Sequence, residues 1–93
     1  MTPPATRRGR ILVVDDEDAV RRSMTEILED EGYEVIPAAS GEEGVEQALA
    51  GSPDAVFLDV WLPGVDGIEA LRMMRERGVS APVIMISGPV SGG

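Results

Sequence analysis

The sequence predicts an α/β fold in which a doubly wound parallel sheet carries helices on both of its faces. Four short, continuous apolar segments alternate with three amphipathic segments along the 93 residues. Such apolar runs are typical of strands that are buried on both faces. The junctions carry helix-start, turn and stop signals. Strands that alternate with helices form parallel sheets with right-handed crossovers, which gives the fold class.

The first strand is predicted at residues 11–14, where four apolar residues are followed abruptly by an acidic run. The first helix is predicted over about residues 18–31. Acidic residues crowd its first turn, where the helix dipole favours them, and Gly32 provides the stop. Its apolar residues fall at i, i+4, i+7 and i+8 on one face. These residues are Val20, Met24, Ile27 and Leu28.

The second strand is predicted at residues 33–38. It is less uniformly apolar than the first and contains Pro37, which favours an edge position in the sheet. Ser40 and Glu43 have the spacing of a capping box, in which each side chain accepts a hydrogen bond from an amide at the start of a helix. The second helix then carries a buried apolar stripe. The stripe consists of Val45, Ala48 and Leu49.

The third strand is predicted at residues 55–58, a second fully apolar run that ends in an aspartate, Asp59. Asp66 and Glu69 repeat the capping-box spacing and start the third helix. The apolar positions of that helix are Ile68, Leu71 and Met74. The fourth strand is predicted at residues 83–86, another apolar run. The repeated order of strand and helix therefore extends along the whole chain.

One domain is predicted at residues 10–88, with a flexible leader at 1–9 and a flexible tail at 89–93. The strand at 83–86 is apolar on both faces, as an interior strand should be, yet nothing predicted after it covers or pairs its outer edge. Two explanations are open. Either the chain is a shortened form of a larger domain, or a second copy supplies the pairing by edge association or exchange of elements.

Composition excludes several classes of function. The chain has 17 acidic and 8 basic residues, a net charge of −9, and neither cysteine nor histidine, so disulfides, thiolate zinc sites and a histidine base are excluded. A pI near 4.3 argues against direct nucleic-acid binding. No segment is predicted to cross a membrane or to act as a signal peptide, so we expect a cytoplasmic protein. Three arginines are interpreted as part of a solvated leader: Arg7, Arg8 and Arg10.

Polar residues follow the first, third and fourth strands. Ligands bind outside the carboxyl ends of parallel strands, so these residues are expected to gather at one edge of the sheet. They are Asp15, Asp16, Asp59 and Ser87. Carboxylates held this close repel one another, and a hard divalent cation such as Mg²⁺, which prefers oxygen ligands, relieves the repulsion. A carboxylate can also attack phosphorus and form an aspartyl phosphate.

A structural explanation stands beside the functional one. Aspartates after strands often cap the next helix or solvate a loop, which would account for Asp15 and Asp16 taken alone, and Ser87 alone would be a turn serine. The third aspartate, Asp59, in the equivalent place after another apolar strand favours a functional site. Trp61 follows in a predicted loop, where it either packs under this edge or is exposed to a partner.

Three segments of the chain resemble the receiver domain of bacterial two-component response regulators. They are Leu-Val-Val-Asp-Asp-Glu at 12–17, the run from Val56 to Gly67 with its Asp-x-x-Leu-Pro-Gly-x-Asp-Gly pattern, and 83–88. The resemblance covers about residues 10–88, and the stretch 27–35, together with 57–61 and 85–88, looks most like NtrX-type regulators. It implies a flavodoxin-like (CheY-like) sheet of order 2-1-3-4 that lacks the family's usual last helix, strand and helix.

The resemblance also implies a role for each candidate site residue. Asp59 is the phosphoacceptor for a sensor histidine kinase or a small phosphodonor, and Ser87 hydrogen-bonds the phosphoryl group and senses it. Asp16, Asp59 and the backbone carbonyl of Trp61 bind Mg²⁺, and Asp15 orients a metal-bound water. Such a module regulates an output such as transcription. It is not an enzyme in the usual sense, although Mg²⁺-dependent self-phosphorylation and dephosphorylation are expected.

The chain departs from the family pattern in ways that keep alternatives open. The family's lysine and its aromatic switch residue have no counterpart, so phosphorylation is expected to be weakened. One alternative is a phosphorylation-impaired interaction module that forms a homodimer through its fourth strand or by element exchange. A Mg²⁺-dependent phosphohydrolase is disfavoured, because no second catalytic acid or base follows Asp59 in an obvious motif.

Overall fold

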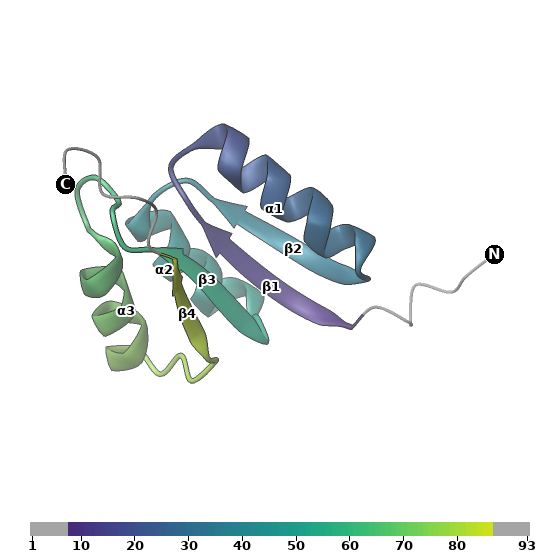
Figure 1. Cartoon of the computed structure of the whole chain (residues 1–93). Coiled ribbons are helices and arrows are strands. Elements are labelled where there is room, and N and C mark those ends of the chain that lie inside the picture. The colour runs from purple at the N-terminus through teal and green to yellow at the C-terminus, as the bar shows by residue number, and fades with distance from the viewer. Residues whose placement is uncertain (1–7, 87–93) are drawn as a thin grey trace.

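A computed structural model of the chain describes residues 8–86. In chain order, the elements are β1 (Gly9–Val14), α1 (Asp18–Asp30), β2 (Tyr33–Ala38), α2 (Gly41–Gly51), β3 (Ala55–Asp59), α3 (Gly67–Glu76) and β4 (Val83–Ile86). The strands form one parallel sheet in the order β2-β1-β3-β4 (Figure 1). The predicted fold class and strand order are therefore confirmed, and β2 occupies the predicted edge.

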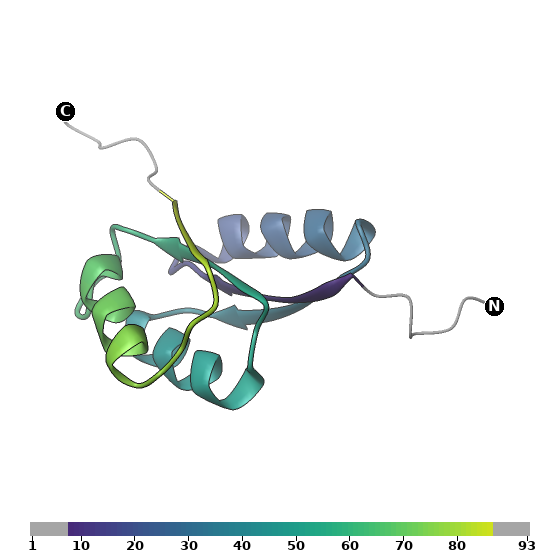
Figure 2. The same ribbon diagram turned by 90° about the horizontal axis from the view of Figure 1, so that it is seen from below.

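The helices divide between the two faces of the sheet. Figure 2 shows α1 on one face and both α2 and α3 on the other, as a doubly wound sheet requires. The face under α2 and α3 holds the main core, in which alternate apolar residues of β1 and β3 pack against the two helices. Its fully buried members are Leu12, Val14, Val45, Val56, Leu58, Ala70 and Met74. This face therefore supplies most of the apolar burial.

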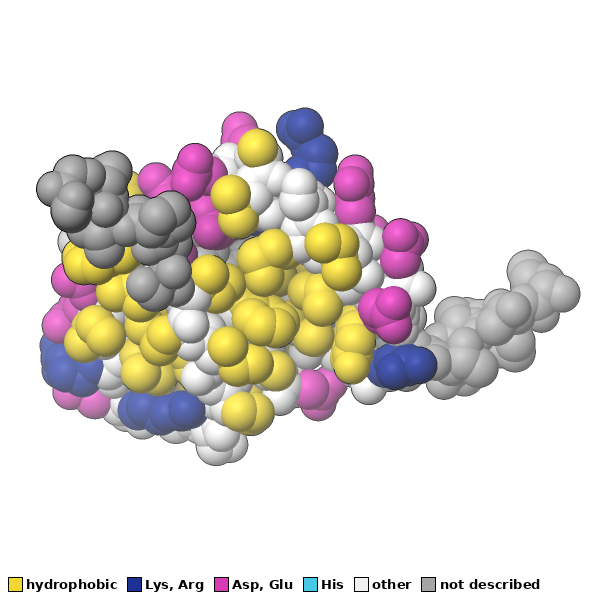
Figure 3. All heavy atoms as spheres, viewed as in Figure 1, with side chains coloured by type: hydrophobic (Ala, Val, Ile, Leu, Met, Phe, Trp, Pro, Cys, Tyr) yellow, Lys and Arg dark blue, Asp and Glu magenta, His cyan; other side chains and the backbone are white. Residues whose placement is uncertain are grey.

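The opposite face of the sheet, under α1, is less fully covered. Helix α1 lies over β1 and β2 (Figure 1), and none of its residues is buried. The side chains of β3 and β4 that point to this face are in part accessible: Phe57 and Ile86 are half-buried, and Ile84 is 47% exposed. Figure 3 shows hydrophobic side chains gathered over this region. We call the surface formed by Phe57, Ile84 and Ile86 the open face.

Three apolar side chains that the periodicity assigns to buried stripes are exposed instead. They are Ile27 of α1, Leu49 of α2 and Ile68 of α3. In each case the helix does turn an apolar face toward the sheet, but the stripe is wider than the surface that covers it. Periodicity identifies the apolar side of a helix, and only the neighbouring elements decide how much of that side is buried.

The start of β1 also differs from the expectation. The strand begins at Gly9, and Arg10 belongs to the sheet rather than to a solvated leader. Arg10 pairs in register with Glu34 of β2, so the two opposite charges lie side by side, with the guanidinium Nε 3.3 Å from the Glu34 carboxylate. Arg10 Nη1 also donates to the carbonyl of Gly51 at 2.5 Å. Residues 1–7 and 87–93, including Ser87 and the predicted tail, lie outside the described residues.

Both predicted helix caps are present, with one change in each. The Ser40 hydroxyl accepts from the Glu43 amide at 3.1 Å, and the Glu43 carboxylate accepts from the amide of Ala39, one residue before the cap. The Asp66 carboxylate accepts from the Glu69 amide at 2.9 Å, while the Glu69 side chain pairs with an arginine on the next turn. Among residues 8–86, no helix is long and apolar enough to span a bilayer.

Candidate functional site

Three carboxylates meet at the carboxyl end of the sheet. Asp15 follows β1 directly and Asp59 is the last residue of β3, and these strands are parallel neighbours, so their ends reach the same edge. One oxygen from each of Asp15, Asp16 and Asp59 lies within 4.8 Å of the others. The chain thus brings together groups that are more than 40 residues apart in the sequence. We call this group the aspartate cluster.

Asp15 is the most enclosed member of the aspartate cluster, with only 4% of its surface exposed. Its amide donates to the carbonyl of Ala38 at the end of β2 at 3.1 Å, and its carboxylate accepts from the Glu17 amide at 2.9 Å. Burial raises the pKa of Asp15, the Glu17 amide opposes this shift, and the negative charges of Asp59 and Asp16 raise the pKa further. A cation at the cluster would relieve that repulsion.

Neither Asp15 nor Asp16 caps α1, although the Asp15 carboxylate does bond the loop amide of Glu17, as the structural explanation allows. The residue at the N-cap of α1 is Glu17, and no side chain caps the helix there. Asp16 is exposed, and its carboxylate makes no hydrogen bond or ion pair with the residues that the structure describes. The Asp16 side chain is therefore placed by the backbone of the loop and is accessible from solvent.

Asp59 is held by the loop that follows it. Its carboxylate accepts from the amide of Trp61 at 3.0 Å, and the amide of Val60 donates to the carbonyl of Ile86 at 3.0 Å. The loop then turns back over the strand end, where the Gly67 amide donates a hydrogen bond to the Val60 carbonyl at 3.1 Å. A Cβ atom on Gly67 would lie 2.2 Å from the Asp59 carbonyl oxygen, so only glycine permits this close return.

The indole of Trp61 lies on the outside of this loop and is 58% exposed, which decides between the two predicted placements. Beside it is an open hollow of about 670 Å³. The hollow is lined by Asp16, Val60, Trp61, Leu62, Pro63, Gly64, Asp66 and Ile68. The aspartate cluster thus borders an accessible surface, from which a phosphodonor or a partner could approach. Ser87, the fourth predicted residue, lies outside the described residues.

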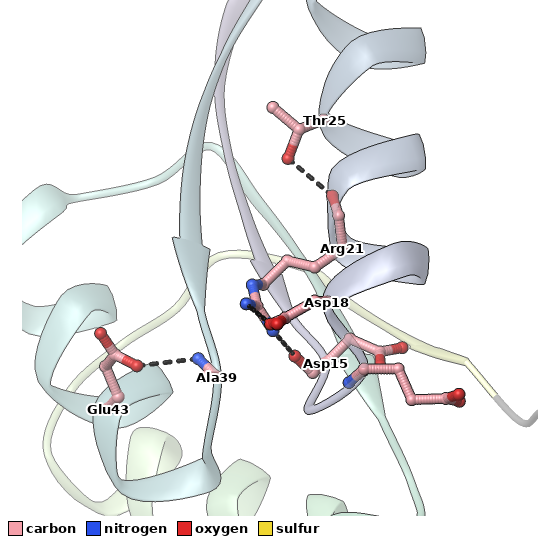
Figure 4. A network of polar contacts seen from close by, with 7 residues as sticks. Asp15, Asp18, Arg21, Thr25, Ala39 and Glu43 are labelled. Carbon is pink, nitrogen blue, oxygen red and sulfur yellow. Dashed lines mark hydrogen bonds and ion pairs between the residues drawn. The ribbon is translucent and has the colours of Figure 1, made fainter.

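Arg21 is a residue near the cluster that the sequence reasoning did not single out. From the second turn of α1 it reaches back to the loop that carries Asp15, and its Nη1 donates to the Asp15 carbonyl at 2.7 Å (Figure 4). Its Nη2 pairs with Asp18. The sequence gives only a weak signal for this role of Arg21. It is a basic residue three positions after Asp18, and its spacing from Asp15 indicates no contact between the two.

Comparison with known families identifies the chain. The model of the response regulator receiver domain matches residues 11–91, most of its length. This chain belongs to the response regulator receiver family. Membership places the protein in two-component signalling, and the aspartate cluster lies where a receiver domain has its acidic pocket.

Curated relatives are similar over nearly all of this chain. The alkaline phosphatase synthesis transcriptional regulatory protein PhoP of Bacillus subtilis is 41% identical over 78 residues, which are 84% of this chain and 32% of that protein. The response regulator MprA of Mycolicibacterium vanbaalenii is 42% identical over 78 residues, 84% of this chain and 34% of the relative. The receiver chain therefore spans about a third of the length of these relatives.

Solved structures support the same assignment. NtrX of Brucella abortus, in complex with ADP, aligns with a TM-score of 0.79 and 39% identity, over 86% of this chain and 19% of that one. The chemotaxis protein CheY4 of Vibrio cholerae aligns with a TM-score of 0.82 and 30% identity, over 89% of this chain and 71% of that one. NtrX is thus a similar structure, as the sequence resemblance indicated.

Proposed function

We propose that this chain is a phosphoacceptor module in which Asp59 takes a phosphoryl group from a sensor histidine kinase in the presence of Mg²⁺. The observation that carries the proposal is the aspartate cluster, in which three carboxylates converge beside an open hollow. Membership in the receiver family supports it. The enclosed position of Asp59, with one of its oxygens fixed by the Trp61 amide, gives the nucleophile a defined orientation.

The donor atoms of the cluster fit Mg²⁺. All are oxygens, and Mg²⁺ in proteins commonly takes one or two carboxylates together with water and phosphate oxygens. Asp16, Asp59 and the backbone carbonyl of Trp61 would hold the ion, and Asp15 would orient a water molecule bound to it. When bound, Mg²⁺ supplies positive charge that offsets the negative charge of the phosphoryl group.

The chemistry assigned to the chain is one displacement at phosphorus. An oxygen of the Asp59 carboxylate attacks, a new O–P bond forms, and the bond between phosphorus and the imidazole nitrogen of the kinase phosphohistidine breaks. The electron pair of the broken bond stays on that nitrogen. We assign Ser87 the role of donating a hydrogen bond to the resulting acyl phosphate. The same displacement on a small phosphodonor would account for self-phosphorylation.

The test uses the chain itself, a small acyl phosphate donor and a gel that retards phosphorylated protein. We expect a shifted band with Mg²⁺, no shift with a chelator, and no shift for Asp59→Asn, because asparagine keeps the shape and removes the nucleophile. Asp30→Asn is the matched control, since Asp30 is an exposed aspartate at the end of α1. Phosphorylation that persists in Asp59→Asn would refute the proposal.

The kinase and the output are further parts of the same proposal. A sensor histidine kinase is the expected donor, and the cytoplasm is the expected compartment, where such phosphorelays operate. The curated relatives include proteins named as transcriptional regulators, among them PhoP and ResD of Bacillus subtilis. We propose that this receiver likewise controls an output such as transcription. Any direct contact with DNA would be made outside this acidic chain.

A second candidate function is favoured by the open face. Within residues 8–86, the outer edge of β4 pairs with no strand, and the apolar residues of the open face lie beside that edge. An unpaired edge with adjacent apolar surface is a template for association. We infer that the chain forms a homodimer through β4 and the open face. The net charge of −9 opposes this association, so added salt should strengthen it.

Light scattering coupled to gel filtration tests this second function. We expect a concentration-dependent dimer, and Ile84→Glu should convert it to monomer because the new charge lies on the open face. Ile68→Glu is the matched control, since Ile68 is 59% exposed and belongs to α3, which lies on the opposite face of the sheet from the open face. A clean monomer at all concentrations, or equal effects of the two substitutions, would dispose of the dimer.

A further inference from the structure

The loop between β1 and α1 is braced by one arginine. The Arg21 amide donates to the Glu17 carbonyl at 2.9 Å, the first helical hydrogen bond of that turn, and its guanidinium Nη1 donates to the Asp15 carbonyl at 2.7 Å. Figure 4 shows the side chain of Arg21 extended from α1 toward Asp15 and Asp18. Only 19% of this side chain is exposed. Arg21 is therefore an enclosed link between the helix and the loop.

The atom that Arg21 holds has a particular importance. The carbonyl of Asp15 belongs to the peptide plane that joins Asp15 to Asp16, and a peptide unit rotates as one rigid plane. The Asp15 amide, on the other side of that residue, is already tied to Ala38 of β2. With Arg21 on the carbonyl, both ends of Asp15 are fixed. The orientation of the peptide plane between Asp15 and Asp16 is therefore fixed, and so is the direction in which the chain continues into Asp16.

Arg21 acts on the backbone and not on the carboxylates. The structure records no hydrogen bond or ion pair from its guanidinium to the side chains of Asp15, Asp16 or Asp59 within the described residues. Its charge is matched by Asp18 instead. The three carboxylates of the cluster consequently keep their negative charge available for a cation, while the loop that carries two of them is held against their mutual repulsion.

We propose that Arg21 is a positioning residue for the aspartate cluster: by holding the Asp15 carbonyl it sets the placement of the Asp15 and Asp16 carboxylates. This inference rests on the proposed function, because it assigns Arg21 to the Mg²⁺ site of the phosphoacceptor. The ordinary alternative is an ion pair between Arg21 and Asp18 that only stabilises the first turns of α1, as pairs three residues apart on a helix do.

A Mg²⁺ titration followed by fluorescence separates these roles, because Trp61 is the single tryptophan of the chain and lies beside Asp59. We expect Arg21→Gln to weaken Mg²⁺ binding by about tenfold, the lower end of the cost of losing a group that orients a metal ligand. Arg22→Gln is the matched control: it removes the same charge one residue away, from an exposed side chain. Its effect should stay below about twofold, because solvent screens it.

Loss of a positive charge by itself favours a bound cation, so net charge alone predicts unchanged or tighter Mg²⁺ binding in both variants. Equal weakening by both substitutions, or no weakening by Arg21→Gln, would overturn the proposal. Arg21→Lys provides a graded variant that keeps the charge but replaces the two guanidinium nitrogens that reach Asp15 and Asp18 with a single ammonium nitrogen. Its affinity should lie between those of the wild type and Arg21→Gln. If Arg21→Gln does not fold, Arg21→Lys decides the matter, and wild-type affinity in that variant would overturn the proposal.

Hydrogen exchange in the metal-free chain gives a readout that does not depend on Mg²⁺. The Glu17 amide is bonded to the Asp15 carboxylate, so its exchange reports whether the loop keeps its form. It should exchange faster in Arg21→Gln than in Arg22→Gln, and unchanged exchange would overturn the brace. If the wild type failed to bind Mg²⁺ while this difference remained, the proposed function would fail and the positioning of the loop by Arg21 would stand.

Discussion

The two faces of the sheet are built from the same four strands but are covered unequally. Phe57 and Leu58 are neighbours on β3, yet Leu58 is fully buried under α2 and α3, whereas Phe57 is half-buried on the open face. On β4, Ile84 points to the open face and remains 47% exposed. The difference teaches that the helices above a strand residue, and not its own hydrophobicity, decide how much of it is buried.

The aspartate cluster lies where these two regions meet. Asp59 and Phe57 are two residues apart on β3, so both side chains point to the α1 face of the sheet. The loop after Asp59 instead packs on the α3 side through Gly67. The stability of the site therefore depends on the covered face. Its access to ligands and partners depends on the less covered one. Three comparisons would sharpen or break this division, and the largest effect is expected in the core.

Leu58→Ala and Ile84→Ala remove similar aliphatic groups from the two faces. Leu58→Ala should lower the free energy of unfolding by about 2–5 kcal/mol, because it leaves a cavity in a packed core. Ile84→Ala should cost less than about 1 kcal/mol, since that side chain is already partly in water. Denaturant unfolding followed by circular dichroism measures both values. Similar losses for the two variants would show that the open face is in fact covered in solution.

This contrast also explains how much of the fold could be predicted. Continuous apolar runs mark β1, β3 and β4 because such runs suit strands with two apolar sides, and Pro37 marks β2 as an edge strand. Their order along the chain then fixes a parallel sheet. Exposure of Ile27 and Ile68 could not be predicted, because the period of a helix says nothing about the size of the surface packed against it.

The site divides in the same way into predictable and unpredictable parts. The convergence of Asp15 and Asp59 follows from topology, since neighbouring parallel strands end at one edge. The bond from the Glu17 amide to Asp15 and the reach of Arg21 depend on the dihedral angles of a short loop, which residue spacing does not specify. The close return of Gly67 was visible only as a glycine in the family motif, with no indication of what it approaches.

Gly67→Ala should have the second largest effect, because it forces apart the loop and the strand end that it covers. The new Cβ would lie 2.2 Å from the Asp59 carbonyl oxygen and 2.8 Å from the Val60 Cα, both backbone atoms that cannot turn aside. We expect a loss of about 1–3 kcal/mol, the usual cost of overpacking. That loss corresponds to a fall in the melting temperature of about 4–8 °C per kcal/mol for a domain of this size.

Gly51→Ala is the matched control for Gly67→Ala. Its new Cβ would also be close to a neighbour, 2.6 Å from Ile36 Cδ1, but that atom is the end of a flexible side chain. Alanine is moreover favoured over glycine in a helix by about 1 kcal/mol. The control should therefore lose little stability or none. If Gly51→Ala were the more damaging of the two, the close backbone return at Asp59 would not be the tight contact described above.

Asp15→Asn should have the smallest effect and concerns the more enclosed of two buried carboxylates on the α1 side, Asp15 and Asp59. Burial, together with the charges of Asp59 and Asp16, raises the pKa of Asp15 in the folded chain above its unfolded value of about 3.9. Protonation of Asp15 therefore favours folding. Its contribution to stability is complete below the unfolded pKa and is lost as the pH rises through the folded pKa.

At pH 7 without metal, Asp15→Asn should consequently melt several degrees above the wild type, because asparagine keeps the acceptor for the Glu17 amide without the buried charge. The difference should shrink as the pH is lowered toward the unfolded pKa, and Mg²⁺ should reverse it by stabilising only the chain that keeps all three carboxylates. Glu46→Gln, which removes an exposed charge from α2, controls for net charge. An Asp15→Asn variant that melts below the wild type in chelator at pH 7 would mean that the Asp15 carboxylate is stabilised where it lies, and that the cluster needs no cation to hold its form.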